Sequence, residues 1–124
     1  MKINLHRWLF LAVALWGILP AGAYDFQVDG IYYEINGDEV TVTNETGSTQ
    51  SNSYSGAVVI PSSVSYNDKT YAVTCIGASA FFRCEDLTSV TLPNTVSVIS
   101  KWVFAGCTGL TSITIPELVT FIGD

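Results

Sequence analysis

Histidine and basic residues are scarce in this sequence. The single histidine, His6, lies near the N-terminus, and five Lys and Arg residues stand against eleven Asp and Glu residues. Catalytic triads and the commonest zinc sites depend on an imidazole group. The glycines are scattered singly, so no Gly-rich phosphate-binding loop is present in the sequence. We therefore expect a protein that is not an enzyme and that binds no cofactor and no metal.

The N-terminal segment, residues 1–23, follows a different pattern from the rest of the chain. Lys2 and Arg7 make a basic start, residues 8–19 form an apolar run, and small residues follow at 20–23. This order is typical of a cleavable secretory signal peptide. The apolar run is shorter than the ~20 residues that a membrane-spanning helix needs. We predict a signal peptide over residues 1–23, a secreted or cell-surface location, and no membrane span after cleavage.

Removal of the predicted signal peptide makes the chain strongly acidic. The remaining 101 residues contain three basic and eleven acidic side chains, a formal charge of −8. This length is enough for one small domain. An acidic surface repels phosphate backbones and anionic lipids, so we expect no nucleic-acid partner.

The strongest positive signal is an internal repeat. Residues 76–98 superpose on residues 99–121, and nearly every large apolar residue of the first copy has a counterpart in the second. The matched pairs are Ile76 with Ile99, Phe81 with Phe104, Cys84 with Cys107, Leu87 with Leu110, Val90 with Ile113, Leu92 with Ile115, and Pro93 with Pro116. Repeats of about 20–29 residues are typical of coils stacked into a solenoid.

Each copy contains two strand signals and one turn signal. Residues 87–93 and 110–116 alternate apolar with small polar residues, which predicts a half-buried strand in each copy. A second strand is expected at residues 96–99. We interpret residues 78–82 and 101–105 as short helical turns that place Phe81 and Phe104 in the core. Asp86 and Gly109 are expected to adopt a left-handed conformation at the following bend.

The N-terminal third has the pattern of a β cap. Residues 26–28, 31–35 and 40–43 are strand-like, and the turn signals between them predict hairpins. A further hairpin is expected around residues 66–71. We divide the exported chain into a cap and loop over residues 24–56 and repeats over residues 57–124, with the cap covering one end of the solenoid core.

Three cysteines occupy repeat positions. Cys84 and Cys107 fall at the same position of successive copies, and Cys75 corresponds to Val98 and Phe121. Free cysteine packs as a small hydrophobic residue, so we interpret all three as buried thiols. Because export is predicted, a disulfide between Cys84 and Cys107 remains an alternative.

One repeated motif resembles a known family. The pattern Ile-Gly-x-x-Ala-Phe-x-x-Cys-x-x-Leu-Thr-Ser-Val-Thr-Leu-Pro runs from Ile76 to Pro93 and recurs in closely similar form from Ile99 to Pro116. It resembles the BspA-type leucine-rich repeat proteins, which are secreted or surface-exposed bacterial proteins. The resemblance implies export, a leucine-rich solenoid, and adhesive roles such as binding matrix glycoproteins or other cells. The motif positions are scaffold, so the resemblance identifies no binding residue.

Together these observations predict a β-rich (α+β) leucine-rich repeat solenoid of about two and a half coils with short helical turns, preceded by an N-terminal β-hairpin cap. Its function is predicted to be an exported, non-enzymatic recognition or adhesion module that binds an extracellular protein or glycan through its solenoid face. The candidate partner contacts are aromatic residues that differ between the repeats and hydroxyls on the outward strand face. They are Phe82, Trp102, Ser89, Thr91, Ser112 and Thr114.

The alternative function is a structural fragment or cap of a larger repeat array. Such a chain would assemble with another repeat chain, or as a homo-oligomer, through an open C-terminal edge. We expect this edge to expose apolar residues such as Leu110, Ile113 and Phe121.

Two further patterns have competing interpretations. The adjacent acids Asp38-Glu39 and Glu85-Asp86 could serve a carboxylate-only hydrolase or bind calcium, but their place at predicted turns favours solvated loop acids. Asn44-Glu45-Thr46 matches a glycosylation acceptor, which is relevant in a eukaryotic producer.

Overall fold

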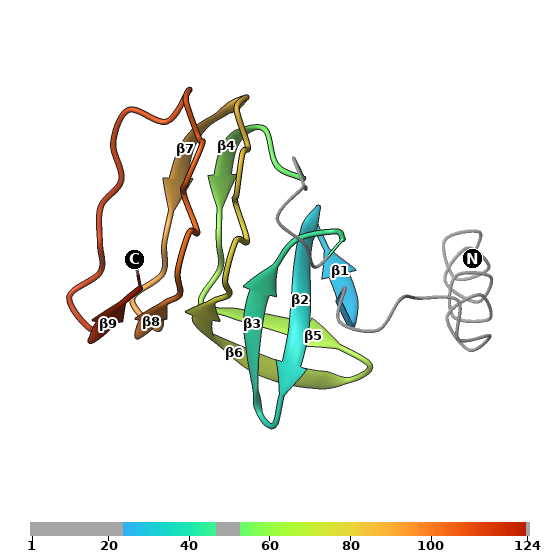
Figure 1. The fold of residues 1–124 in the computed structure, drawn as a ribbon. Helices are drawn as coiled ribbons and strands as arrows, with labels where there is room; N and C mark the ends of the chain where they lie inside the picture. Colours follow the sequence, from blue (N-terminus) through green and yellow to red (C-terminus); the bar gives the residue numbers. More distant parts are fainter. Residues whose placement is uncertain (1–23, 47–52, 124) are drawn as a thin grey trace, which may run out of the picture.

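The computed structural model of the protein describes residues 24–46 and 53–123. The predicted signal peptide (1–23), part of the predicted loop (47–52) and residue 124 lie outside these described residues. Within them the chain forms nine strands and no helix, so no helix there is long and apolar enough to cross a membrane (Figure 1). The strands are β1 (Phe26–Val28), β2 (Ile31–Asn36), β3 (Glu39–Thr43), β4 (Gly56–Val59), β5 (Ser63–Tyr66), β6 (Lys69–Ile76), β7 (Leu87–Thr91), β8 (Val98–Ile99) and β9 (Phe121–Ile122).

The N-terminal strands form the predicted hairpins. β1 pairs antiparallel with β2, and β2 pairs antiparallel with β3. The turn between β1 and β2 holds Asp29 at φ 52° and Gly30 at φ 81°. Two consecutive left-handed residues match the twist of the flanking strands, which explains the Asp-Gly sequence. The predicted hairpin around residues 66–71 is also confirmed, because β5 pairs antiparallel with β6.

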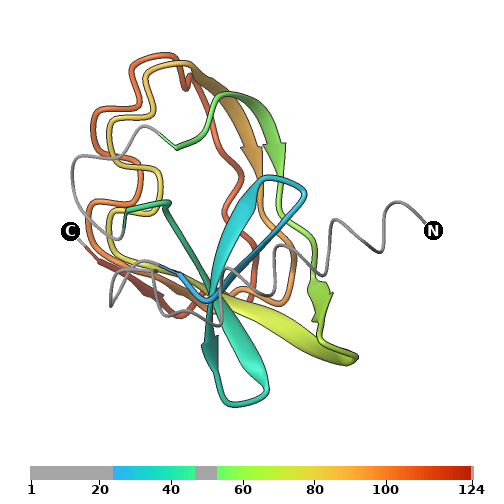
Figure 2. The ribbon, with the colours of Figure 1, turned by 90° about the vertical axis from the view of Figure 1, so that its right-hand side faces the viewer.

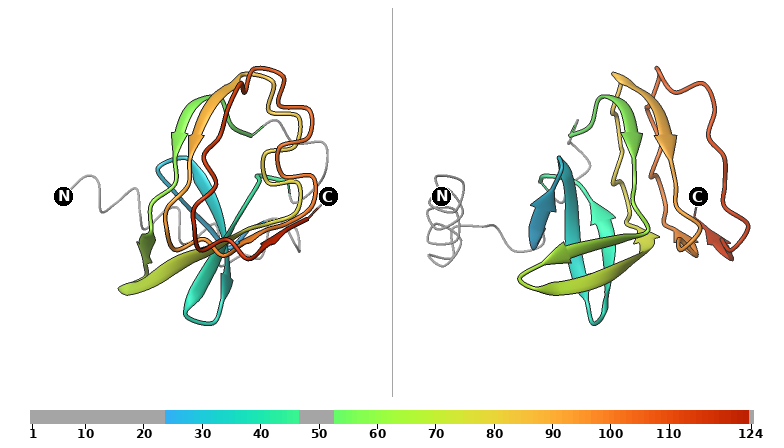
Figure 3. Two further views of the ribbon diagram at one scale, coloured as in Figure 1. Left: turned by 90° about the vertical axis from the view of Figure 1, so that its left-hand side faces the viewer. Right: turned by 180° about the vertical axis from the view of Figure 1, so that it is seen from behind.

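Strand β3 connects the hairpins to the repeats. It pairs parallel with β6, which pairs parallel with β8, and β8 pairs parallel with β9 (Figure 3). The same hydrogen bond recurs at each step: Gly77 N donates to Val42 O (2.8 Å), Ser100 N to Ile76 O (2.9 Å) and Gly123 N to Ile99 O (2.8 Å). The ladder from β6 through β8 to β9 pairs equivalent positions of successive copies, as the sequence repeat predicts. Strand β3 therefore occupies the place that a strand of a preceding coil would occupy.

A second, two-stranded sheet lies on another side of the coil. Strand β4 pairs parallel with β7. On and just after β7 the side chains alternate as predicted, with Val90 and Leu92 buried and Ser89 and Thr91 exposed. The prediction of a matching strand at residues 110–116 is wrong, because that segment is not a strand in the structure. Its apolar residues are poorly covered, and Ile115 is 41% exposed, so burial contributes little to holding it extended.

The predicted helical turns are also wrong. Residues 78–83 instead form consecutive β-turns, in which Ala80 N donates to Gly77 O (3.1 Å) and Phe82 N donates to Ser79 O (3.0 Å). Ser79 and Arg83 have φ values of 60° and 56°, and the equivalent residues one repeat later have φ values of 60° and 78°. A left-handed residue at every fourth position interrupts a right-handed helix. The α+β description is therefore corrected to β-rich without helices in the described residues.

The core is continuous from the hairpins to the second repeat. Phe81 is fully buried, and its ring lies 4.6 Å from the Tyr54 ring and 5.5 Å from the Phe104 ring, measured between centroids. Leu87, Val96 and Ile76 are also fully buried around this aromatic stack. The predicted core positions Phe81 and Phe104 are thus brought together along the solenoid axis, although Phe104 is only partly buried.

Gly109 marks a close approach of neighbouring coils. Its φ is not left-handed, contrary to the sequence-based expectation, and neither is that of Asp86. A Cβ at Gly109 would lie 2.7 Å from Glu85 O and 3.1 Å from Leu87 O. Glycine is needed here because the backbone of the preceding coil occupies the space of a side chain.

We expect Gly109→Ala to lower the free energy of unfolding by about 1–3 kcal/mol, because the coils must separate to relieve the clash. Urea unfolding followed by circular dichroism measures this effect. The matched control is Asp86→Ala, which alters the equivalent bend of the first repeat where a Cβ is already present; we expect about 0.5 kcal/mol or less. Equal losses in the two variants would contradict the close-approach explanation.

The last described coil exposes apolar side chains. Leu118, Phe121 and Ile122 are 62%, 58% and 57% exposed. Leu110 and Ile113 are half-buried and pack against the core. The expected exposure is therefore confirmed for Phe121 and is only partial for the other two residues.

Candidate functional site

The outward face of the β4–β7 sheet carries small side chains. The register places Ala57 beside Ser89 and Val59 beside Thr91. All four residues are exposed, and Val59 is 66% exposed. Ser112 and Thr114 are exposed at the equivalent positions one repeat later. Four of the six predicted contact residues therefore present hydroxyl groups, each of which both donates and accepts hydrogen bonds.

The two predicted aromatic contacts lie in the turns. Trp102 is 49% exposed, and Lys101 Nζ lies 5.1 Å from the centroid of its ring. Phe82 is half-buried, and Arg83 Cζ lies 5.7 Å from its ring centroid. Each aromatic face is thus engaged by the cation beside it in sequence, at distances typical of cation–π contacts.

The six candidate residues form two surfaces and not one. Viewed along the solenoid axis, β4 and β7 lie on one side of the coil, and the turns at 78–83 and 101–106 lie on the opposite side (Figure 2). We call these the sheet face (Ala57, Val59, Ser89, Thr91, with Ser112 and Thr114) and the turn face (Phe82 and Trp102 with their cations). A small ligand on one surface therefore does not contact the other.

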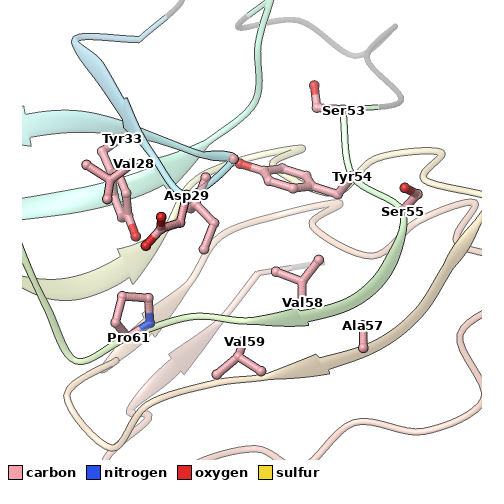
Figure 4. A pocket seen from close by; sticks show the side chains of 12 residues that line it. Val28, Asp29, Tyr33, Ser53, Tyr54, Ser55, Ala57, Val58, Val59 and Pro61 are labelled. Atoms are coloured by element: carbon pink, nitrogen blue, oxygen red, sulfur yellow. The ribbon is translucent and has the colours of Figure 1, made fainter. Parts of the chain in front are cut away.

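A pocket of about 420 Å³ opens between the β1–β2 turn and strand β4 (Figure 4). The pocket was not predictable from the sequence, because its walls come from segments that lie far apart in the sequence and only the folded chain brings them together. Asp29 is the one charged residue among those that line it, and Val58 points from β4 into the hollow. Its other walls include Ile31, Tyr33 and Tyr54.

Two tyrosines join this pocket to the core. The Tyr54 hydroxyl accepts a hydrogen bond from Tyr32 N (3.1 Å) and donates one to Thr43 O. Burial raises the pKa of Tyr54 well above its usual range. Burial, and next the charge of Asp29, raises the pKa of Tyr33 to about 12. Both hydroxyls stay protonated at neutral pH and act as neutral hydrogen-bonding groups.

The comparisons with known proteins agree with the repeat and the sheet topology. A family model described as the BspA type leucine rich repeat region, of six copies, matches residues 29–124. The chain belongs to this family. No curated protein matches the BspA-type chain.

Solved structures give the same fold for this BspA-type chain. A leucine-rich repeat protein from Bacteroides capillosus is 31% identical, with a TM-score of 0.64 over 78% of this chain and 69% of that protein. A leucine rich cell surface protein from Faecalibacterium prausnitzii is 28% identical, with a TM-score of 0.64 over 79% of this chain and 26% of that protein. A leucine-rich repeat protein from Bacteroides ovatus is 28% identical, with a TM-score of 0.56 over 81% of this chain and 32% of that protein. The chain thus spans about a quarter to a third of the latter two proteins.

The cysteines of the BspA-type repeats are free thiols in the structure. Cys84 and Cys107 are buried, as predicted, and burial raises the pKa of both thiols. Cys107 Sγ donates a hydrogen bond to Phe81 O (2.9 Å). Cys75 is only half-buried, so its prediction as a fully buried thiol is wrong. The reason is its place near the end of β6, at the same register position as the half-buried Val98.

We expect one thiol per chain to react rapidly with a disulfide reagent such as DTNB in the native protein. Cys75 is the reactive group, because the other two are buried and hold less thiolate at neutral pH. All three thiols are expected to react after unfolding in guanidinium chloride. In a Cys75→Ser variant the rapid phase should disappear, and a remaining rapid phase of one equivalent would contradict this assignment.

The acidic pairs Asp38-Glu39 and Glu85-Asp86 belong to no cluster that could hold a metal ion within residues 24–46 and 53–123. No group of three or more suitable ligands occurs there. Asp38 forms an exposed ion pair with Lys69 (2.9 Å), which lowers the pKa of the carboxyl. Glu85 and Asp86 are exposed in a turn. Their interpretation as loop acids agrees with these positions.

Asn44 is unsuited to glycosylation in the folded protein. It is 1% exposed, and its Nδ2 donates a hydrogen bond to Ser79 O (2.9 Å). The amide therefore connects the end of β3 to the first turn of the repeats, and a sugar would have to displace it.

Proposed function

We propose that this BspA-type protein is an exported, non-enzymatic recognition module that binds an extracellular protein or glycan through its sheet face. The observation that carries the proposal is the exposure of Ser89 and Thr91 beside Ala57 and Val59. Ser89 and Thr91 lie two residues apart on β7, so both hydroxyls stand on the same face, about 6.7 Å apart along the strand. Extended solenoid faces of this kind suit broad polar partners.

The charge of the chain narrows the class of partner. With the predicted signal peptide removed, the chain contains eleven acidic residues and three basic residues. Nucleic acids and anionic lipids are disfavoured by this charge. Neutral glycans and basic or neutral glycoproteins fit it better. The Faecalibacterium relative is described as a cell surface protein, which supports the proposed location.

An array of immobilised glycans and extracellular matrix glycoproteins tests this function. We expect the wild-type protein to bind a subset of the array. The sheet variant Ser89→Arg/Thr91→Arg places two long cations on the face and is expected to weaken that binding at least tenfold. Its fold is checked by circular dichroism.

The turn variant Phe82→Ala/Trp102→Ala serves as the comparison, because it alters the opposite side of the coil. We expect it to retain binding to the same array members. Loss in both variants would extend the binding surface to the turn face. Unchanged binding in both would remove the proposal.

A second candidate function is assembly with another repeat chain through the β9 end. Leu118, Phe121 and Ile122 support it, because all three apolar side chains are exposed and the last two form β9, the outermost strand of the described ladder. Light scattering after size exclusion distinguishes the candidates. A defined oligomer that becomes monomeric in Phe121→Ser/Ile122→Ser would favour assembly, whereas a monomer would favour the recognition module.

A further inference from the structure

We infer that the free edge of β4 is a docking site for an extended peptide segment of a partner protein, with a basic side chain of that peptide facing Asp29. The site lies on the hairpin side of β4 and not on the sheet face. The docking site uses the hairpin-side backbone edge of β4 and the pocket beside it, whereas the proposed recognition surface uses the outward side chains of β4 and β7. The two sites share Ala57 and Val59.

The first observation is an unpaired strand edge. Gly56 N donates to Asp86 O (2.9 Å) and Ile60 N donates to Thr91 O (3.0 Å), so alternate residues of β4 point their backbone groups toward β7. The N–H and C=O groups of Ala57 and Val59 consequently point to the other side, since successive residues of a strand alternate. In the described part of the chain, β4 pairs with β7 alone. An edge of this kind offers donors and acceptors to an added strand.

The second observation is the pocket beside this edge. One side of its lining is the β1–β2 turn from Val28 to Ile31. The other side includes Ala57, Val58, Val59 and Pro61. The volume of about 420 Å³ lies within the usual range for ligand sites, about 300–1,000 Å³. A peptide strand beside β4 would direct every second side chain into this hollow, against Tyr54 and Val58 (Figure 4).

The third observation is the charge of the pocket. Asp29 lies on the wall across from β4, and no basic residue lines the pocket. A lysine or arginine in the docked peptide would meet this carboxylate in a partly enclosed site, where charge pairing is stronger than in open water. The favoured occupant is therefore a basic, extended, β-prone peptide.

The strand paired with the opposite edge of β4 provides a template for a probe peptide. On its other side β4 already holds β7 in parallel, with the sequence Leu-Thr-Ser-Val-Thr. A probe peptide, acetyl-Lys-Val-Thr-Val-Lys-amide carrying a fluorophore, reproduces this alternation and adds basic ends. We expect saturable binding in fluorescence anisotropy, with chemical-shift changes at the Ala57 and Val59 amides in nitrogen-15 spectra of the full chain.

The decisive variant is Val59→Pro, which removes the edge N–H and leaves the hydrogen bonds to β7 intact. We expect it to weaken peptide binding at least tenfold, and Val59→Thr, which keeps the N–H, to bind within about twofold of the wild type. Circular dichroism verifies that both variants fold. A second test needs no variant: the same peptide with alternate backbone amides N-methylated should bind at least tenfold more weakly.

The charge component is tested separately with Asp29→Asn, for which a severalfold weaker and less salt-dependent binding is expected. Absence of saturable binding at millimolar peptide would overturn the inference. Binding that is lost in Asp29→Asn but unchanged in Val59→Pro would also overturn it, because the pocket would then hold a ligand that does not pair with the strand.

Discussion

Replacing Phe81 by alanine is expected to lower the free energy of unfolding by about 3–5 kcal/mol. The ring is fully buried and stacks between Tyr54 and Phe104, at centroid distances of 4.6 Å and 5.5 Å. It therefore joins the segment before β4 to both repeats. A domain of this size is stabilised by about 5–15 kcal/mol in total, so the variant should lose much of its stability. Urea unfolding followed by circular dichroism and intrinsic fluorescence measures the loss.

The neighbouring phenylalanine provides the control. Phe82 is half-buried in the turn, and its ring makes a cation–π contact with Arg83. We expect Phe82→Ala to cost about 1 kcal/mol or less, because little packed volume is removed. Similar decreases in the free energy of unfolding for Phe81→Ala and Phe82→Ala would show that the aromatic stack contributes no special stability to the core.

Replacing Tyr54 by phenylalanine is expected to lower the free energy of unfolding by about 2–3 kcal/mol. The hydroxyl accepts from Tyr32 N and donates to Thr43 O, so its removal leaves one backbone donor and one backbone acceptor without this partner in a poorly solvated place. The aromatic ring is retained, which isolates the hydrogen bonds. The same unfolding measurement applies.

Tyr66→Phe is the matched control for this prediction. The Tyr66 ring stacks on Phe26 at a centroid distance of 4.3 Å, and the substitution keeps that stack. We expect a change of about 0.5 kcal/mol or less at this half-buried position. If Tyr54→Phe costs no more than Tyr66→Phe, the hydroxyl does not connect the hairpins to the repeats.

The solenoid was predictable because its physical cause repeats in the sequence. A parallel strand ladder pairs residues that are one coil apart, so the ladder offset equals the sequence period. Ile76, Ile99 and Ile122 therefore stand in register, each one repeat length after the last. The same alternation that buries Val90 exposes Ser89 and Thr91, which is why the exposure of these two residues was predictable from the sequence.

Residues 78–82 and 101–105 were wrongly predicted as helical turns because three of the four positions with positive φ carry residues that do not usually mark a left-handed conformation. Ser79, Arg83 and Trp102 all adopt positive φ. The fourth such position, Gly106, is the only one of the four occupied by glycine, the residue type that usually indicates a positive φ. Hydrogen bonds from Ser79 N to Lys101 O (3.1 Å) and from Phe81 N to Val103 O (3.1 Å) hold these turns against the next coil. These bonds depend on stacking and not on local sequence.

The pocket and the split between the two candidate surfaces depend on long-range packing. The Asp29-Gly30 turn and strand β4 meet because β3 joins the parallel ladder, which no local pattern in residues 24–43 indicates. Trp102 and Ser89 are both exposed, yet the turn at 101–106 and strand β7, to which they belong, lie on opposite sides of the coil (Figure 2). Sequence alternation predicts exposure, whereas the grouping of exposed residues requires the coil geometry.

Recognition of an extracellular partner by the sheet face is best tested by amide hydrogen exchange. The exchange is compared between the free protein and the protein bound to a retained glycan or matrix glycoprotein from the array. We expect slower exchange on binding over residues 56–59 and 87–91, with the turns at 101–106 unchanged. Protection confined to residues 117–123, or a failure of every array member to alter exchange, would contradict it.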